Sequence, residues 1–130
     1  MNPSRCFTLA GACALALLVS SCGSDNPSGP SGGGGGTVAA TITITSAGVS
    51  PKAVTVAAGS RVMFVNNDSR PHEIDSNPHP EHTDCPEINV GFIGAGASGT
   101  TQNLTRVRTC GYHDHINPDV VALQGTITTQ

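Results

Sequence analysis

The residues with the clearest potential for chemistry are a cysteine and two histidines in the second half of the chain. Cys110 and His113 stand three residues apart, and His72 lies well upstream of both. Thiolate sulfur stabilises Cu(I), whereas imidazole suits both oxidation states of copper. One cysteine and two histidines that converge on a single pocket would therefore bind copper, and we expect His72, Cys110 and His113 to be the ligands.

Further possible ligands lie close to these three. The segment His79–Cys85 contains His79, His82 and Cys85, and His115 follows His113 by two positions. This segment could form a second metal site, or it could cover the first. His115 could bind the metal or support a ligand. The neighbouring carboxylates, including Asp75 and Asp114, are expected to be solvated or to form turns.

The N-terminal region has the features of a secretory signal peptide over residues 1–21. Arg5 precedes the apolar stretch Phe7–Val19, which is too short to span a bilayer. Small residues before Cys22 resemble the lipobox of bacterial lipoproteins, and this resemblance implies that Cys22 becomes the lipidated N-terminus. An ordinary signal peptide cut nearby is the alternative. Residues 22–36 are rich in glycine, serine and proline and predict a tether, so the domain is expected at 37–130.

Export changes the interpretation of the two cysteines that remain in the domain, Cys85 and Cys110. Disulfides persist outside the cytoplasm, so these two could be bonded to each other. A disulfide would remove the thiolate and leave a site made of histidines alone: His72, His113 and His115, with His79 or His82. Such a site would bind Cu(II) without an intense blue colour, and both possibilities stay open.

Composition excludes several classes of function. After removal of the signal, five basic residues face nine acidic ones, a net charge of −4, and no basic patch indicates nucleic-acid binding. Few aromatic residues are present, so stacking platforms for bases or sugars are not expected. Neither a Ser-His-Asp order nor an HExxH motif is present, so these motifs give no indication of an enzyme.

The elements that must position these residues are short strands. No segment has a sustained helical period, and apolar and polar residues alternate in several stretches. About seven strands at roughly ten-residue spacing predict an all-β Greek-key sandwich. The segments that indicate strands are Thr41–Thr45, Ala53–Ala57, Arg61–Asn66, His72–Asp75, Thr100–Leu104, Thr105–Thr109 and Gln124–Thr128. Residues 76–87 are expected to form a loop, and Cys110–His113 a tight turn.

The order of these motifs resembles that of the cupredoxins, the small blue copper proteins that include plastocyanin and amicyanin. The resemblance rests on Val54–Asp68, Pro71-His72, Cys110-Gly-Tyr-His113 and Gly125-Thr-Ile127, and it covers nearly all of the domain. It implies a cupredoxin-like fold, a copper cofactor and His72, Cys110 and His113 as ligands.

One position departs from the family pattern. Leu123 stands where cupredoxins usually have an axial methionine, and leucine cannot bind a metal. Gln124 is a candidate axial ligand if the loop shifts by one residue. The sequence thus predicts a copper protein in the bacterial cell envelope, facing the periplasm or the exterior and tied to the membrane by lipid alone.

Three functions remain open for such a protein. The first is single-electron transfer between protein partners. The second is copper tolerance or delivery through a histidine-rich site with a Cys85–Cys110 disulfide, which needs copper-exchange partners. The third is a structural sandwich without metal.

Overall fold

The computed structural model describes residues 35–130. The predicted signal peptide, Cys22 and residues 22–34 of the predicted tether lie outside the described residues. The described part contains nine β-strands and two short 3₁₀ helices, and no helix in it is long and apolar enough to cross a membrane. The elements are β1 (Val38–Thr45), β2 (Gly48–Ser50), β3 (Ala53–Val56), β4 (Arg61–Asn66), β5 (His72–Ser76), η1 (Pro86–Ile88), β6 (Gly91–Ile93), β7 (Ser98–Thr100), β8 (Arg108–Asp114), η2 (Val121–Leu123) and β9 (Gly125–Thr129).

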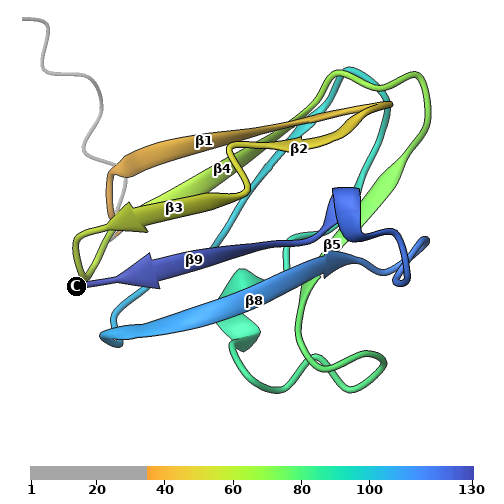
Figure 1. Cartoon of the computed structure of the whole chain (residues 1–130). Coiled ribbons are helices and arrows are strands. Elements are labelled where there is room, and N and C mark those ends of the chain that lie inside the picture. The colour runs from red at the N-terminus through yellow and green to blue at the C-terminus, as the bar shows by residue number, and fades with distance from the viewer. Residues whose placement is uncertain (1–34) are drawn as a thin grey trace, which may run out of the picture. The chain divides into compact units, whose positions relative to one another are not determined.

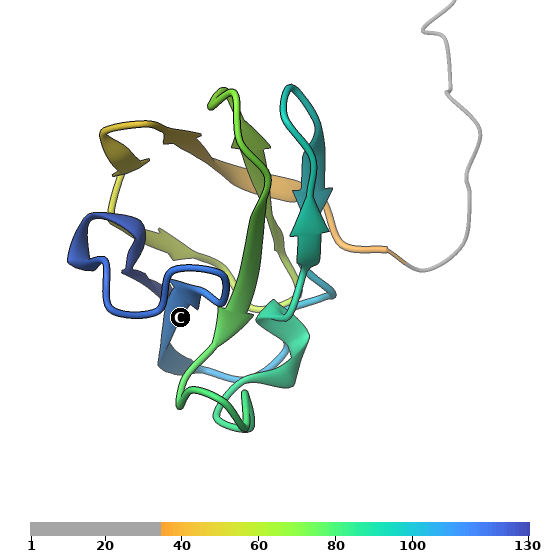
Figure 2. The same ribbon diagram turned by 90° about the vertical axis from the view of Figure 1, so that its right-hand side faces the viewer.

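The strands form two sheets packed face to face, which confirms the predicted all-β sandwich. One sheet has the order β2-β1-β4-β7 and the other β3-β9-β8-β5-β6. Figure 1 shows β1 and β4 on one side of the sandwich and β8 and β9 on the other, and Figure 2 shows the same layers along a perpendicular direction. Nine strands replace the predicted seven because short pairings add β2 and β6 outside the segments predicted as strands. The predicted strand Thr100–Leu104 shares only Thr100 with β7.

The core lies between the two sheets, and the alternation that points side chains into it is clearest in β4. In β4, Val62, Phe64 and Asn66 are fully buried while the residues between them are only half-buried. Phe64 meets Tyr112 of the opposite sheet edge to face, with ring centroids 5.1 Å apart. Burial of a side chain such as Phe64 stabilises the fold by roughly 1.5–3 kcal/mol, so this contact helps to hold the two layers together.

Strand β8 differs most from its prediction. The expected strand Thr105–Thr109 and the expected turn at Cys110–His113 are replaced by one strand, Arg108–Asp114. This strand pairs on both sides, with β9 and with β5, and no register shift interrupts either ladder. Pairing on two sides outweighs the weak turn signal of Gly111.

A disulfide fastens the long loop after β5 to this central strand. Cys85 and Cys110 are bonded to each other, and both are buried. Hydrogen bonds support the same attachment, because the Asn77 N–H donates to the Gly111 carbonyl at 3.1 Å and the Asp84 N–H donates to the Asn77 carbonyl at 2.9 Å. The loop between β5 and η1 is therefore tied to β8 at both of its ends, through Asn77 and through Cys85.

Candidate metal centre

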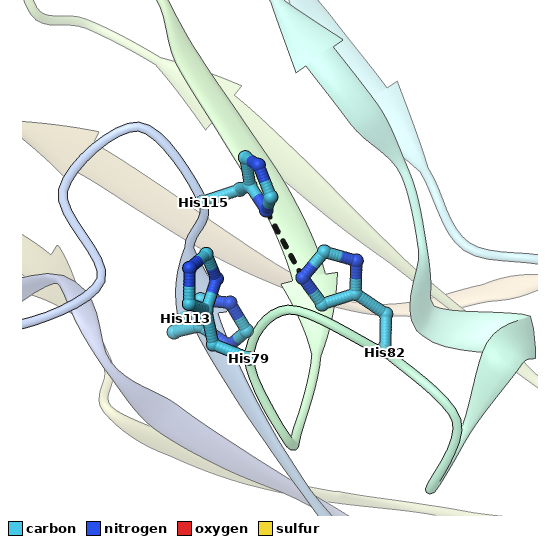
Figure 3. A group of neighbouring side chains, drawn as sticks. All are labelled: His79, His82, His113 and His115. Atoms are coloured by element: carbon cyan, nitrogen blue, oxygen red, sulfur yellow. Dashed lines mark hydrogen bonds between the residues drawn. The ribbon is translucent and has the colours of Figure 1, made fainter.

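Four imidazoles converge where this loop meets the end of β8. We call His79, His82, His113 and His115 the histidine cluster; one potential ligand nitrogen from each lies within 4.8 Å of the others. Figure 3 shows two rings from the loop facing two from β8 and the residue that follows it. His113 is buried, His82 and His115 are half-buried, and His79 is exposed. The cluster is thus a site on the protein's edge that an ion can reach from solvent.

His113 of β8 and His115, the residue just after the strand, share a face because alternate residues of an extended chain point the same way. His113 pairs with Asp75 of β5, and the His115 N–H extends the ladder by donating to the Glu73 carbonyl at 2.7 Å. Both imidazoles project from the face of the sheet that turns away from the sandwich interior. The loop covers this face, which explains why His113 is buried outside the core.

The two loop histidines are held by backbone and side-chain hydrogen bonds. The carbonyl of His82 accepts from Ser76 Oγ at 3.0 Å and from Asn89 Nδ2 at 3.1 Å. His82 has a φ of 53°, in the left-handed region that non-glycine residues seldom adopt. A conformation of this kind costs on the order of 1–3 kcal/mol and persists only where surrounding contacts enforce it. The loop is therefore built to place His82 against the end of β8.

The surroundings of His113 favour its neutral imidazole. Burial lowers the pKa of His113, and the neighbouring His82 and His79 lower it further, although the Asp75 carboxylate acts in the opposite direction. Its Nδ1 lies 2.9 Å from Asn77 Oδ1, while its Nε2 is buried with no hydrogen-bond partner among the described residues. A buried nitrogen without a partner is costly unless something binds to it. This nitrogen belongs to the group that could hold a metal.

Imidazole nitrogens at this spacing suit a borderline transition metal. Zinc, copper, nickel and iron all accept histidine ligands, whereas calcium and magnesium prefer oxygen. No sulfur lies in the cluster, so the chemistry of the site is that of nitrogen ligands alone.

The predicted set His72, Cys110 and His113 is not assembled in the structure, and this is a correction. Three positions separate Cys110 from His113 along a continuous strand, so their side chains point to opposite faces of the sheet. His72 shares the face of Ile74, which pairs with Asp114, and therefore also points away from His113. The predicted convergence required a turn after Cys110 that the chain does not make.

Both proposed ligands on the inner face have other partners. Cys110 is bonded to Cys85, so neither sulfur is a thiolate. The His72 ring lies between two carboxylates, with Nδ1 3.0 Å from Asp114 Oδ2 and Nε2 3.3 Å from Asp68 Oδ2. Asp114 is fully buried and Asp75 is 6 % exposed, so neither carboxylate is solvated. Asp114 does form a turn, as the other alternative predicted, because its Oδ1 accepts from the Ile116 N–H and its carbonyl from the Asn117 N–H. His72 belongs to a buried polar network and not to the cluster.

The candidates near the usual axial position also lie elsewhere. Leu123 is a core residue of η2, and it lines a small cavity beside His72 and Asn117. Gln124 donates from Nε2 to the Pro118 carbonyl at 2.8 Å and is not one of the four clustered residues.

All four members of the cluster were among the predicted possible ligands, but the Cys110–His113 spacing favoured a different set. The spacing of His113 and His115 by two positions was the signal that could have joined them, because such residues share a face in any strand. The attachment of His79 and His82 depends on the disulfide, which was one of the two alternatives for Cys85 and Cys110.

Several solved structures of similar shape are cupredoxins. A purple cupredoxin from Nitrosopumilus maritimus aligns with 70% of this chain and 99% of its own, at 20% identity and a TM-score of 0.52. Amicyanin from Paracoccus versutus aligns with 70% of this chain and 80% of its own, at 15% identity and a TM-score of 0.56. Plastocyanin from Dryopteris crassirhizoma aligns with 69% and 99%, at 17% identity and a TM-score of 0.54. No protein-family model and no curated protein matches the sequence. The described domain therefore has the cupredoxin fold.

Proposed function

We propose that this protein captures a copper ion through His79, His82, His113 and His115 and serves copper tolerance or delivery. The observation that carries the proposal is the convergence of four imidazole nitrogens within 4.8 Å at a solvent-accessible edge. The disulfide removes Cys110 from the ligand set and fastens the loop that supplies two of the four histidines.

Copper is favoured over other metals by the ligand chemistry. Affinity of a nitrogen site for divalent first-row ions rises to Cu²⁺ and falls again at Zn²⁺. Imidazole ligands can also bind Cu(I), although this site lacks the thiolate that favours Cu(I) in blue copper sites. An amicyanin structure of the same fold is described as containing Cu(I), which supports copper as the ion.

An exposed rim fits exchange of the ion better than its permanent retention. His79 is exposed and His115 only half-buried, so a partner that offers its own ligands can approach the metal from outside. We propose that the partners are copper-exchange proteins and that no nucleic acid takes part.

Single-electron transfer is the second candidate. Solved structures of the same fold are described as oxidised plastocyanin and as a reduced amicyanin mutant, and this observation favours it. Voltammetry of the copper-loaded protein tests this candidate. Reversible electron exchange would support electron transfer, whereas slow or absent exchange would leave only copper capture and delivery.

A location in the cell envelope is part of the proposal. The Cys85–Cys110 disulfide supports an oxidising compartment, and the Cys22 lipobox supports a lipid anchor. Metabolic labelling with a palmitate analogue tests the anchor, since Cys22→Ser should abolish incorporation.

The proposed metal site is tested by competition titration of Cu(II) against a chelator. We expect one ion per chain, with an affinity that His113→Ala reduces by more than the ~10–100-fold typical of an outer-shell partner. His72→Asn is the matched control, because it removes a histidine outside the cluster and should leave the affinity of the folded protein unchanged. Equal losses in the two variants would contradict the assignment.

A further inference from the structure

Asp75 and Asn77, on either side of Ser76 at the end of β5, each lie close to the Nδ1 atom of a clustered histidine. Asp75 Oδ2 lies 3.7 Å from His82 Nδ1, with both side chains largely buried, and Asn77 Oδ1 lies 2.9 Å from His113 Nδ1. We propose that Asp75 and Asn77 are positioning residues that fix His82 and His113 in the tautomer with the proton on Nδ1. The inference deepens the proposed copper function and rests on it.

The proton positions follow from which atoms can donate. An amide oxygen accepts only, so the 2.9 Å contact with Asn77 Oδ1 requires the proton on His113 Nδ1. The Nε2 lone pair of His113 is then free, and this is the buried nitrogen without a partner among residues 35–130. At His82, a lone pair on Nδ1 would face the Asp75 carboxylate at 3.7 Å. Repulsion between the two therefore favours the proton on that nitrogen.

The tautomer of His82 determines that of His115. Its Nδ1 lies 3.0 Å from His82 Nε2, a contact drawn as the dashed line in Figure 3. Because His82 carries its proton on Nδ1, its Nε2 accepts, and His115 Nδ1 must donate. A metal ion that replaces this shared proton would be bound by His82 through Nε2 and by His115 through Nδ1. His115 must then move its proton to Nε2, so metal binding changes the tautomer of His115 alone among these three.

The position of Asn77 depends on a glycine. A Cβ on Gly111 would lie 2.3 Å from Asn77 Nδ2, too close for both to remain in place. Gly111→Ala should therefore displace the Asn77 side chain from His113 without touching a ligand. Gly94→Ala is the matched control, since the nearest atom to its new Cβ is Phe92 Cε1 at 3.9 Å.

The test is nuclear magnetic resonance of histidine side-chain nitrogens in the ¹⁵N-labelled protein, at about pH 8, where an ordinary imidazole with a pKa near ~6.5 is neutral. Without metal, His82, His113 and His115 should all carry the proton on Nδ1. With Zn(II), which is diamagnetic, His115 should change to the Nε2–H tautomer while the other two remain as they were.

Affinity measurements on variants add a second readout. Asn77→Ala, Gly111→Ala and Asp75→Asn should each weaken Zn(II) and Cu(II) binding by ~10–100-fold, the usual cost of losing an outer-shell partner. Asn77→Asp keeps an oxygen acceptor and should recover most of the loss, and Gly94→Ala should bind as the parent does. Asn77→Ala should also release the fixed tautomer of His113 in the metal-free spectrum.

The possible failures are distinguishable. Normal metal binding with His82 or His113 protonated on Nε2 would overturn the positioning inference and leave the proposed function intact. The expected metal-free tautomers without binding of either metal would overturn the proposed function and, with it, the assignment of donor atoms.

Discussion

Removal of the disulfide should both destabilise the domain and weaken metal binding. The double variant Cys85→Ala/Cys110→Ala opens a covalent loop with a sequence separation of 25 residues. For a loop of this length, the chain-entropy model gives about 3.5 kcal/mol of lost stability at 25 °C. The loss of two buried side chains at the joint adds to this value. In a domain of this size, such a change lowers the melting temperature by on the order of 15–25 °C.

The effect on the cluster is the more informative half of this prediction. The disulfide and the Asn77 hydrogen bonds hold the His79–His82 loop on β8, so the variant must order that loop when the ion binds. Urea unfolding followed by circular dichroism gives the stability, and chelator competition gives the Cu(II) affinity. A variant within ~1 kcal/mol of the parent, with unchanged Cu(II) affinity, would refute the role given to the disulfide.

Three further predictions concern the buried polar groups. Burial raises the pKa of Tyr112 above its ordinary 10.0, so the stability it supports is complete below about pH 10 and declines at higher pH as the unfolded chain ionises. The Tyr112 hydroxyl has no hydrogen-bond partner within the described domain. Tyr112→Phe should therefore remove the decline in stability, as measured by urea unfolding between pH 9 and 11. An identical decline in the variant would contradict the role of Tyr112. His72→Asn should cost about 2 kcal/mol through the lost charged hydrogen bond to Asp114 without changing Cu(II) affinity. Burial alone would raise the pKa of Asp114, but hydrogen bonds from the Glu73 N–H, Asn117 and His72 lower it below 3.8. The stability that this carboxylate contributes is therefore present above that pH and is lost in acid. Because His72→Asn removes one of these bonds, its acid unfolding should begin at a higher pH than that of the parent.

The fold could be predicted from the sequence because the strands carry local signals. Arg61–Asn66 alternates so regularly that its predicted bounds match β4 without error. By contrast, β8 owes its length to pairing with β5 and β9, and nothing local to Cys110–His113 reports those partners. The expected turn there was wrong for this reason, and it placed Cys110 and His113 on one face when the strand places them on two.

The candidate site could be predicted in its residue types but not in its membership. Histidine spacing indicated a metal, and His79, His82, His113 and His115 were all candidates. Their convergence depends on which of two fates Cys85 and Cys110 adopt, and that choice is made by contacts between residues far apart in the chain. Asp75 and Asn77 carry no recognisable motif and become relevant only through their positions next to His82 and His113.

The central claim is that a copper ion binds to histidine nitrogens and not to Cys110. The most direct measurement is the paramagnetic resonance and absorption spectrum of the protein loaded with one equivalent of Cu(II). We predict a wide copper hyperfine splitting with nitrogen couplings, a pale colour and no free thiols, as expected for nitrogen ligands without thiolate. An intense blue or purple band with a narrow hyperfine splitting would show sulfur ligation and contradict the claim.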